Sequence, residues 1–97
     1  MAKGYWIGRV TVTDPQTYQT YIAGNGRAFE KYGAKFLIRG GSFVCMEGES
    51  RDRNVVIEFE SYDQAIACYN SPEYQEVLKY RADASISDMI IIEGYEG

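Results

Sequence analysis

The chain has 97 residues, which suffices for one small domain and leaves no room for a second hydrophobic core. Its 10 basic and 14 acidic residues give a net charge of −4, which argues against nucleic-acid binding because that function normally requires a basic surface. The absence of histidine excludes Ser-His-Asp and Cys-His catalysis and every His-ligated metal site.

The first residues lack the charged and then apolar pattern of a signal peptide. The purest apolar run, residues 89–92, is far shorter than the roughly 20 residues that a membrane helix needs. Cys45 and Cys68 stand outside any C-x-x-C pair or metal-ligand spacing, so we expect two reduced, partly buried thiols, no metal and no other cofactor. These features predict a cytoplasmic location.

Residues 4–13 are rich in aromatic and β-branched side chains, which predicts a first strand. Asp14 is a suitable helix N-cap, and Pro15 fits the first helical position because its missing N–H costs nothing there. The apolar spacing that follows predicts a helix over 15–32, with Gly33 at its C-terminal end.

The segment 34–39 predicts a second strand, which the glycines at 40–41 interrupt. We expect residues 42–48 to resume an extended conformation after a bulge or kink. A hairpin turn over 48–52 then leads into a third strand over 53–60.

Ser61 and Gln64 form a capping box that opens a second helix. The dipeptide 71–72, Ser-Pro, predicts a restart of that helix at a new angle, with a second leg over 73–83. The last strand is expected over 87–95.

The resulting order, β-α-β-β-α-β, predicts a single ferredoxin-like α+β domain over residues 1–97. In this fold a four-stranded antiparallel sheet carries both helices on one face. Right-handed crossovers place the first and third strands in the middle of the sheet.

Side chains alternate along a strand, so each predicted strand divides into two sets. One set is uncharged and is assigned to the helix-covered core: Trp6, Gly8, Val10, Phe36, Ile38, Val55, Ile57, Phe59, Ile90 and Ile92. The other set is mixed, with apolar Ile7, Leu37, Val56, Met89 and Ile91 beside Arg9, Arg39, Glu58 and Glu93.

This second face is too apolar to be left in water, and the helices cover only the opposite face of the sheet. We therefore expect a homodimer through the face that bears Ile7, Leu37, Val56 and Ile91, with the two sheets packed into a barrel. The alternative is a monomer whose half-apolar sheet face stays exposed.

Four strings in the chain resemble the DUF1330 family of small bacterial proteins, which belongs to the dimeric α+β barrel superfamily. They are GYWI at 4–7, F-x-x-YG-x-KFL-x-RGG at 29–41, RNVVIEF at 53–59 and ACY-x-SPEYQ at 67–75. The resemblance covers essentially the whole chain and implies a ferredoxin-like protomer, a homodimer and a bacterial cytoplasmic setting. It implies no activity, because the family is functionally uncharacterised. The wider superfamily includes cofactor-independent monooxygenases, lactone isomerases and haem-dependent enzymes, and the lack of histidine weakens the haem-dependent reading.

Arg39 and Glu58 are the candidate catalytic residues, because the predicted alternation places them on one sheet face and on neighbouring strands. The arginine would clamp a substrate carboxylate, and the glutamate would accept a proton if burial raises its pKa. The alternative is a structural ion pair that ties the barrel together.

Four further residues are candidates for ligand binding: Asn25, Tyr5, Cys68 and Tyr69. Asn25 is the single polar residue on the buried stripe of the first helix, and the tyrosines offer aromatic walls with polar tips for a flat ligand. Against these readings stand a structural hydrogen bond for Asn25, core or dimer packing for the tyrosines, and a packed thiol for Cys68.

Two functions from different classes follow. One is a cofactor-independent enzyme of the isomerase or monooxygenase type that acts on a small organic acid or aromatic compound. The other is a non-catalytic dimer that binds a small ligand or serves in a stress response. A cavity of roughly 300 Å³ or more between sheet and helices, with convergent polar groups, would favour a ligand site under both hypotheses. A solidly packed interior, with Arg39 and Glu58 wholly engaged with each other, would count against both.

Overall fold

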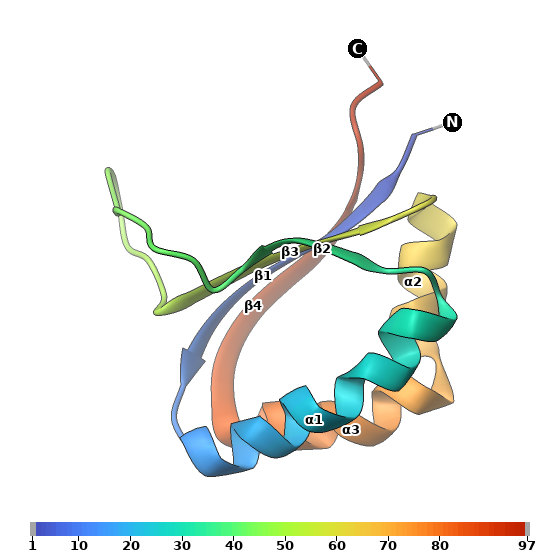
Figure 1. Cartoon of the computed structure of the whole chain (residues 1–97). Coiled ribbons are helices and arrows are strands. Elements are labelled where there is room, and N and C mark those ends of the chain that lie inside the picture. Colours follow the sequence, from blue (N-terminus) through green and yellow to red (C-terminus); the bar gives the residue numbers. More distant parts are fainter. Residues whose placement is uncertain (1, 97) are drawn as a thin grey trace.

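A four-stranded antiparallel sheet with helices on one face makes up residues 2–96, the part of the chain that the computed structural model describes (Figure 1). The ends of the predicted domain, residues 1 and 97, lie outside the described residues. The strands follow the spatial order β2 (Lys35–Arg39), β3 (Arg53–Phe59), β1 (Gly4–Val12) and β4 (Ser85–Glu93). The helices are α1 (Pro15–Lys31), α2 (Tyr62–Asn70) and α3 (Pro72–Ala84). The ferredoxin-like topology is therefore confirmed, with β1 and β3 in the middle.

The helix boundaries lie where the sequence places caps. The carboxylate of Asp14 accepts a hydrogen bond from the backbone N–H of Thr17, and Gly33 ends α1 with a φ of 69° that favours glycine. Ser71 separates α2 from α3, because its hydroxyl donates to the Cys68 carbonyl at 2.7 Å and accepts from the Tyr74 N–H at 3.2 Å. The predicted break in the second helix is confirmed.

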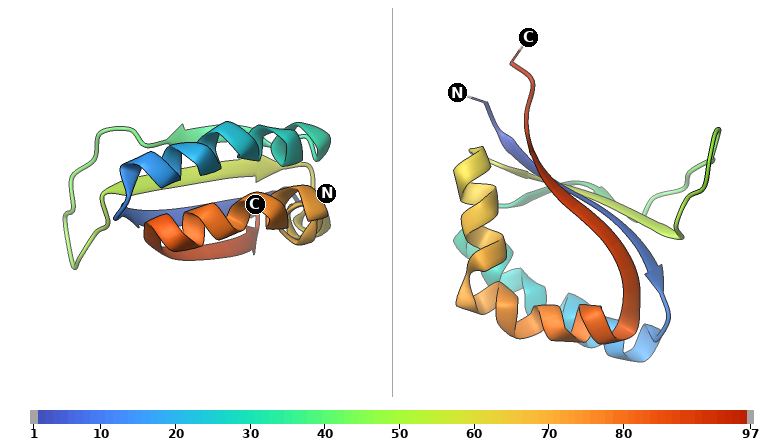
Figure 2. Two further views of the ribbon diagram at one scale, coloured as in Figure 1. Left: turned by 90° about the horizontal axis from the view of Figure 1, so that it is seen from below. Right: turned by 180° about the vertical axis from the view of Figure 1, so that it is seen from behind.

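The helices lie against one face of the sheet (Figure 2), and the core sits between these two layers. It is centred on Trp6 of β1. The indole N–H of Trp6 donates to the Ala65 carbonyl at 2.9 Å, which ties β1 to α2. Three further rings, those of Phe29, Phe59 and Tyr74, have centroids 4.9–5.4 Å from the Trp6 ring.

The prediction that residues 42–48 resume a strand is wrong. Gly40 takes a φ of +70° after the end of β2, and the chain leaves the sheet as a long loop, residues 40–52. No strand pairs with residues 42–48, and the loop projects beyond the sheet and away from the helices (Figures 1 and 2).

The assignment of β4 side chains to the two faces is also wrong. Ile91 lies opposite Trp6 and Met89 opposite Gly8, so both face the helices. Ile90 and Ile92 lie on the open face, where they are 54% and 45% exposed. Residues 89–92 are all apolar, so their own pattern cannot show which of them face the helices. The pairing of β4 with β1 decides it.

A β-bulge in β2 changes the face on which Arg39 lies. Phe36 pairs with Ile57 whereas Ile38 pairs with Val56, so Leu37 is the extra residue. Beyond the bulge the parity is reversed. Ile38, expected in the core, lies on the open face, and Arg39 lies on the helix-covered face.

The two ends of the described chain run side by side. The N–H of Gly94, just after β4, donates to the carbonyl of Lys3, just before β1, at 2.7 Å. Within residues 2–96, no helix has the length and apolar character needed to cross a membrane.

Candidate functional site

A cavity lies between the sheet and helices α1 and α3. Its walls are mostly apolar and aromatic, with the strands contributing Trp6, Gly8, Val10, Val55, Ile57 and Met89. The space between the walls is about 480 Å³, including the part open to solvent. Only about 40 Å³ of this space is wide enough to admit water. Since one water needs roughly 10–15 Å³ measured in this way, the cavity has room for about three waters.

Three arginines line this cavity, and its lining includes no aspartate or glutamate. They come from three elements, with Arg39 at the end of β2, Arg53 at the start of β3 and Arg81 in α3. Each guanidinium carbon lies over an aromatic ring: Arg39 over Phe36 at 4.2 Å, Arg53 over Tyr18 at 5.9 Å, and Arg81 over Tyr21 at 5.8 Å. The cavity therefore combines flat apolar walls with concentrated positive charge.

Arg81 is the most buried of the three, with only 8% of its surface exposed. Its Nε has no hydrogen-bond partner, and the Nε of Arg53 is likewise buried and unpartnered. Arg81 escaped the sequence analysis, although its spacing carries a signal. It lies seven residues after the buried Tyr74 and therefore falls on the inward face of α3.

Asn25 of α1 lines the same cavity and is buried, as the sequence suggested. Next to it, the hydroxyls of Tyr21 and Tyr74 share a hydrogen bond of 2.7 Å. Burial raises the pKa of both phenols. At Tyr21 the hydrogen bond with Tyr74 and the charge of Arg81 offset that rise in part, and the guanidinium of Arg81 has the same effect at Tyr74. Both tyrosines are therefore neutral hydrogen-bonding groups at physiological pH.

The predicted Arg39–Glu58 pair does not form. Arg39 lines the cavity, whereas Glu58 pairs with Tyr5 of β1 and so lies on the open face. There the Glu58 carboxylate accepts a hydrogen bond from the Tyr5 hydroxyl at 3.2 Å and lies 3.9 Å from the Lys3 ammonium. Tyr5 is thus also placed away from the cavity. Arg39 and Glu58 are separated because the bulge at Leu37 turns Arg39 to the other face of the sheet.

Cys68 is completely buried and does not line the cavity. Its thiol points from α2 to the carbonyl of Ala28 in α1, with a sulfur–oxygen distance of 3.7 Å. Burial raises the pKa of the Cys68 thiol to about 12, which makes it a packing group rather than a nucleophile. Cys45, in contrast, is exposed, so the prediction that it is partly buried is wrong.

Tyr69 lies behind the cavity rather than in its lining. Its ring contacts those of Trp6 and Tyr74, with centroids 5.7 and 5.4 Å away. Together with Leu78 and Arg81 it lines a second, separate pocket. Tyr69 therefore supports the cavity wall without facing the cavity.

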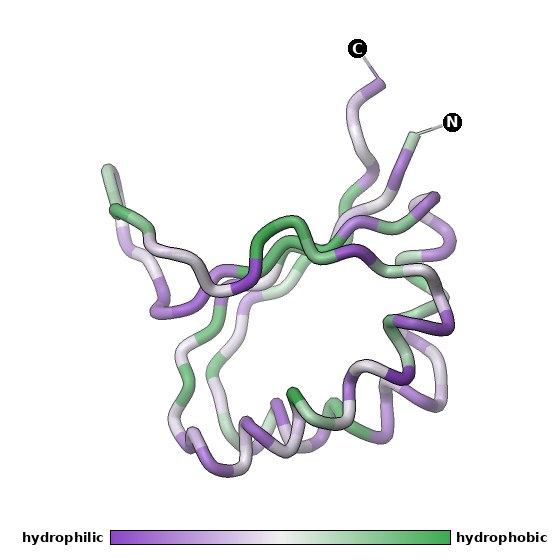
Figure 3. Tube along the Cα trace, viewed as in Figure 1, coloured by the Kyte–Doolittle hydropathy of each residue, from purple (hydrophilic) through white to green (hydrophobic). Residues whose placement is uncertain are grey.

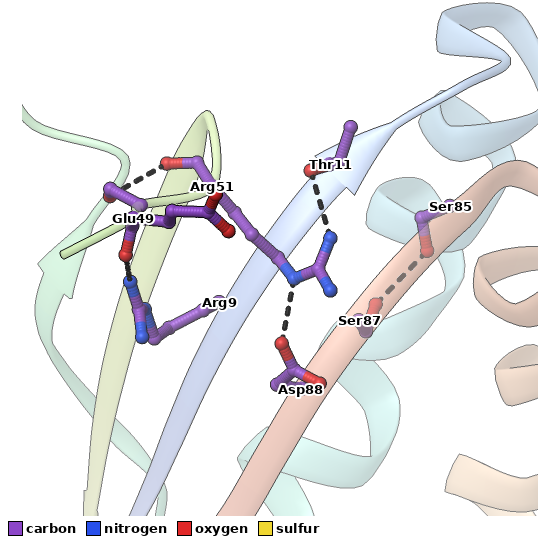
Figure 4. Close-up of polar contacts among 8 residues, drawn as sticks. Arg9, Thr11, Glu49, Arg51, Ser85, Ser87 and Asp88 are labelled. Carbon is purple, nitrogen blue, oxygen red and sulfur yellow. Dashed lines mark hydrogen bonds and ion pairs between the residues drawn. The ribbon is translucent and has the colours of Figure 1, made fainter.

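The open face of the sheet carries a different kind of polar cluster (Figure 4). Arg51 in the long loop donates to the Asp88 carboxylate at 2.7 Å and to the Thr11 hydroxyl at 3.2 Å, while Arg9 donates to the Glu49 carbonyl at 2.8 Å. These contacts hold the return of the loop against β1 and β4.

Hydrophobic residues follow the strands and recur in the loop (Figure 3), where Phe43, Val44 and Met46 are exposed.

The fold and the cavity together define a small ferredoxin-like α+β protein with a candidate small-molecule site. The chain matches the family described as a domain of unknown function, DUF1330, over residues 3–95, and so belongs to that family. A search of curated proteins found no match.

Solved structures of similar fold include a protein of unknown function from Rhodopseudomonas palustris. It is 21% identical, with a TM-score of 0.78 over 99% of this chain and 85% of that one. SnoaB, a cofactor-independent oxygenase from Streptomyces nogalater, is 13% identical, with a TM-score of 0.65 over 100% and 97% of the chains. A dimeric ferredoxin-like protein of unknown function from Thermobifida fusca is 15% identical, with a TM-score of 0.58 over 95% and 91%. At these identities the likeness establishes the shared fold.

Proposed function

We propose that the protein binds a small organic molecule with a flat, apolar body in the cavity between the sheet and the helices. The observation that carries this proposal is the cavity itself, in which aromatic and aliphatic walls surround a few convergent polar groups. This is the composition typical of small-molecule sites.

The ligand must be small or must displace side chains as it enters. The free space holds about three waters, whereas Arg39 is exposed and Arg53 is half-buried. These two side chains mark the outer end of the cavity. Because arginine side chains are long and flexible, we expect them to move aside when a ring-sized ligand binds.

Trp6 gives a direct test, because it is the single tryptophan of the chain and lines the cavity. We expect small aromatic compounds to change its fluorescence in a saturable manner. Val55→Phe, which fills the cavity, should weaken that binding at least tenfold. Val44→Phe makes the same exchange at an exposed loop position and should leave it unchanged. Equal binding by the two variants would contradict the proposal.

A second candidate, cofactor-independent oxygenation of the bound molecule, is supported by the fold shared with SnoaB. The cavity lining offers no histidine, carboxylate or thiol as a general base, so the substrate itself must be acidic enough to ionise on binding. Oxygen uptake with 1,4-dihydroxynaphthalene, in purified protein without added metal or flavin, tests this candidate. Uptake that exceeds the protein-free rate and falls in Val55→Phe would support it. Uptake at the protein-free rate would leave ligand binding alone.

We also propose that the protein forms a homodimer through the open face of the sheet. Apolar side chains cover the middle of that face: Ile7, Ile38, Val56, Ile90 and Ile92. Compared with the interface inferred from the sequence, Ile90 and Ile92 thus replace Ile91, and Ile38 replaces Leu37, the extra residue of the bulge. The similar protein from Thermobifida fusca is dimeric.

Light scattering tests the dimer, for which the expected mass is about twice the 11.0 kDa of one chain. Val56→Arg places a charge at the centre of the face and should yield the monomer mass. Ala67→Arg, on the exposed side of α2, should remain dimeric. A monomer mass for the unmodified protein at micromolar concentration would refute this assembly.

The two unpaired thiols suit a reducing compartment, and we propose a cytoplasmic location.

A further inference from the structure

We infer that the ligand of the cavity is an organic anion and that Arg81 is the group that recognises its negative charge. This inference rests on the proposed function, namely that the cavity binds a small organic molecule. It adds the chemical class of the ligand and the residue that selects it.

The distribution of charge is the first argument. The chain has 14 acidic and 10 basic residues, yet the cavity lining includes three arginines and no acidic residue. Elsewhere cations do find carboxylates, as Lys31 does with Glu73 at 2.8 Å and Arg51 with Asp88 at 2.7 Å. Within residues 2–96, no ion pair involves any of the three cavity arginines. Positive charge therefore accumulates in this cavity with no acidic side chain in its lining to neutralise it.

The burial of Arg81 is the second argument. An arginine keeps its charge inside proteins, and a buried charge is costly unless it is paired and hydrogen-bonded. Only 8% of the surface of Arg81 is exposed, and its Nε has no hydrogen-bond partner. A carboxylate or phenolate oxygen in the cavity would supply both the missing acceptor and the opposite charge. A neutral ligand would supply at most the acceptor.

The positions of the other two arginines complete the site. Arg39 in β2 pairs with Val55 in β3, and Val55 is two residues after Arg53. The two arginines therefore lie at the same end of the cavity. Because Arg39 is exposed and Arg53 half-buried, this end faces solvent, and its charge attracts an anion toward the cavity. Arg81 then holds the charged group inside, while Trp6 and Tyr18 contact the flat body of the ligand.

Benzoate and benzamide, which have nearly the same shape but differ in charge, test this inference on the full chain through Trp6 fluorescence. We expect benzoate to bind at least tenfold more tightly than benzamide. Arg81→Met should remove this preference by weakening benzoate binding and leaving benzamide binding unchanged, which a merely structural role of Arg81 would not do. Arg27→Met, an exposed arginine of α1 outside the cavity lining, makes the same change in net charge and should keep the preference.

A measurement on the unmodified protein keeps the test valid if Arg81→Met fails to fold. In NMR spectra of the arginine Nε–Hε groups, benzoate should shift the Arg81 signal, identified by its loss in Arg81→Lys, more than benzamide does. If benzamide binds as tightly as benzoate and shifts that signal equally, the inference is wrong while the proposed function stands. If neither compound binds, the proposed function fails together with the inference.

Discussion

The two faces of the sheet differ in how their cations are paired. On the open face, cations meet acceptors of this chain, as Arg51 meets Asp88 and Lys3 meets Glu58. On the helix-covered face, Arg81 lies among aromatic rings with no carboxylate beside it. Paired charge stabilises a surface, whereas unpaired buried charge destabilises a fold unless something else compensates it. This contrast is the basis for proposing a ligand site on the covered face and a protein interface on the open one.

The strongest way to break the covered face is Trp6→Ala. It removes the largest fully buried side chain, four ring contacts and the hydrogen bond to Ala65. We expect the free energy of unfolding in urea to fall by about 3–5 kcal/mol, the usual cost of such a cavity. A loss below about 1 kcal/mol would show that the aromatic cluster is not the centre of the core.

Two neighbouring residues of β4 sharpen the comparison, because Ile91 faces the core and Ile90 the open face. Ile91→Ala should lower the free energy of unfolding by about 2 kcal/mol at every protein concentration. Ile90→Ala should act mainly through the dimer, so its effect should depend on protein concentration. If the two variants behave in the opposite way, the register of β4 is wrong.

Ser71→Ala tests the helix break that supports the covered face. The hydroxyl of this buried serine bonds to both helices that it separates. Its loss should cost about 1–2 kcal/mol in thermal or urea unfolding, and Ser71→Thr should restore part of that loss. Equal stability of the alanine and threonine variants would argue against a capping role.

The smallest effect concerns pH. Burial raises the pKa of Cys68 from an ordinary value of 9.0 to about 12 in the folded chain, so the unfolded chain releases that proton first. The contribution of this thiol to stability is therefore complete below pH 9 and is lost as the pH rises toward 12. Urea unfolding at pH 7, 9 and 10 should show a decline above pH 9 that is shallower in Cys68→Ala. An identical decline in both proteins would mean that other groups cause it, among them Tyr21 and Tyr74, whose pKa values burial also raises.

The elements and their order could be predicted from the sequence because local signals mark them. Asp14, Pro15 and Gly33 delimit α1, and Ser71 separates α2 from α3, where caps and a positive φ require those residue types. Such signals depend on a few neighbouring residues and survive in the fold.

The candidate site was harder to predict because it depends on register. A single extra residue at Leu37 moved Arg39 to the cavity and separated it from Glu58, and nothing in the apolar run of β4 distinguished Ile90 from Ile91. Asn25 was found because it interrupts a buried stripe. Arg81 was missed because an arginine near the end of a helix is usually taken for a solvated residue, although its spacing from Tyr74 placed it inward.

The bond between Gly94 and Lys3 has a topological consequence. Because the outgoing strand β4 finishes beside the start of β1, a few added residues would bridge the two ends without crossing the sheet (Figure 1). The long loop, which pairs with no strand, is then a natural place for new termini. A circularly permuted chain opened in that loop should therefore fold to the same sheet.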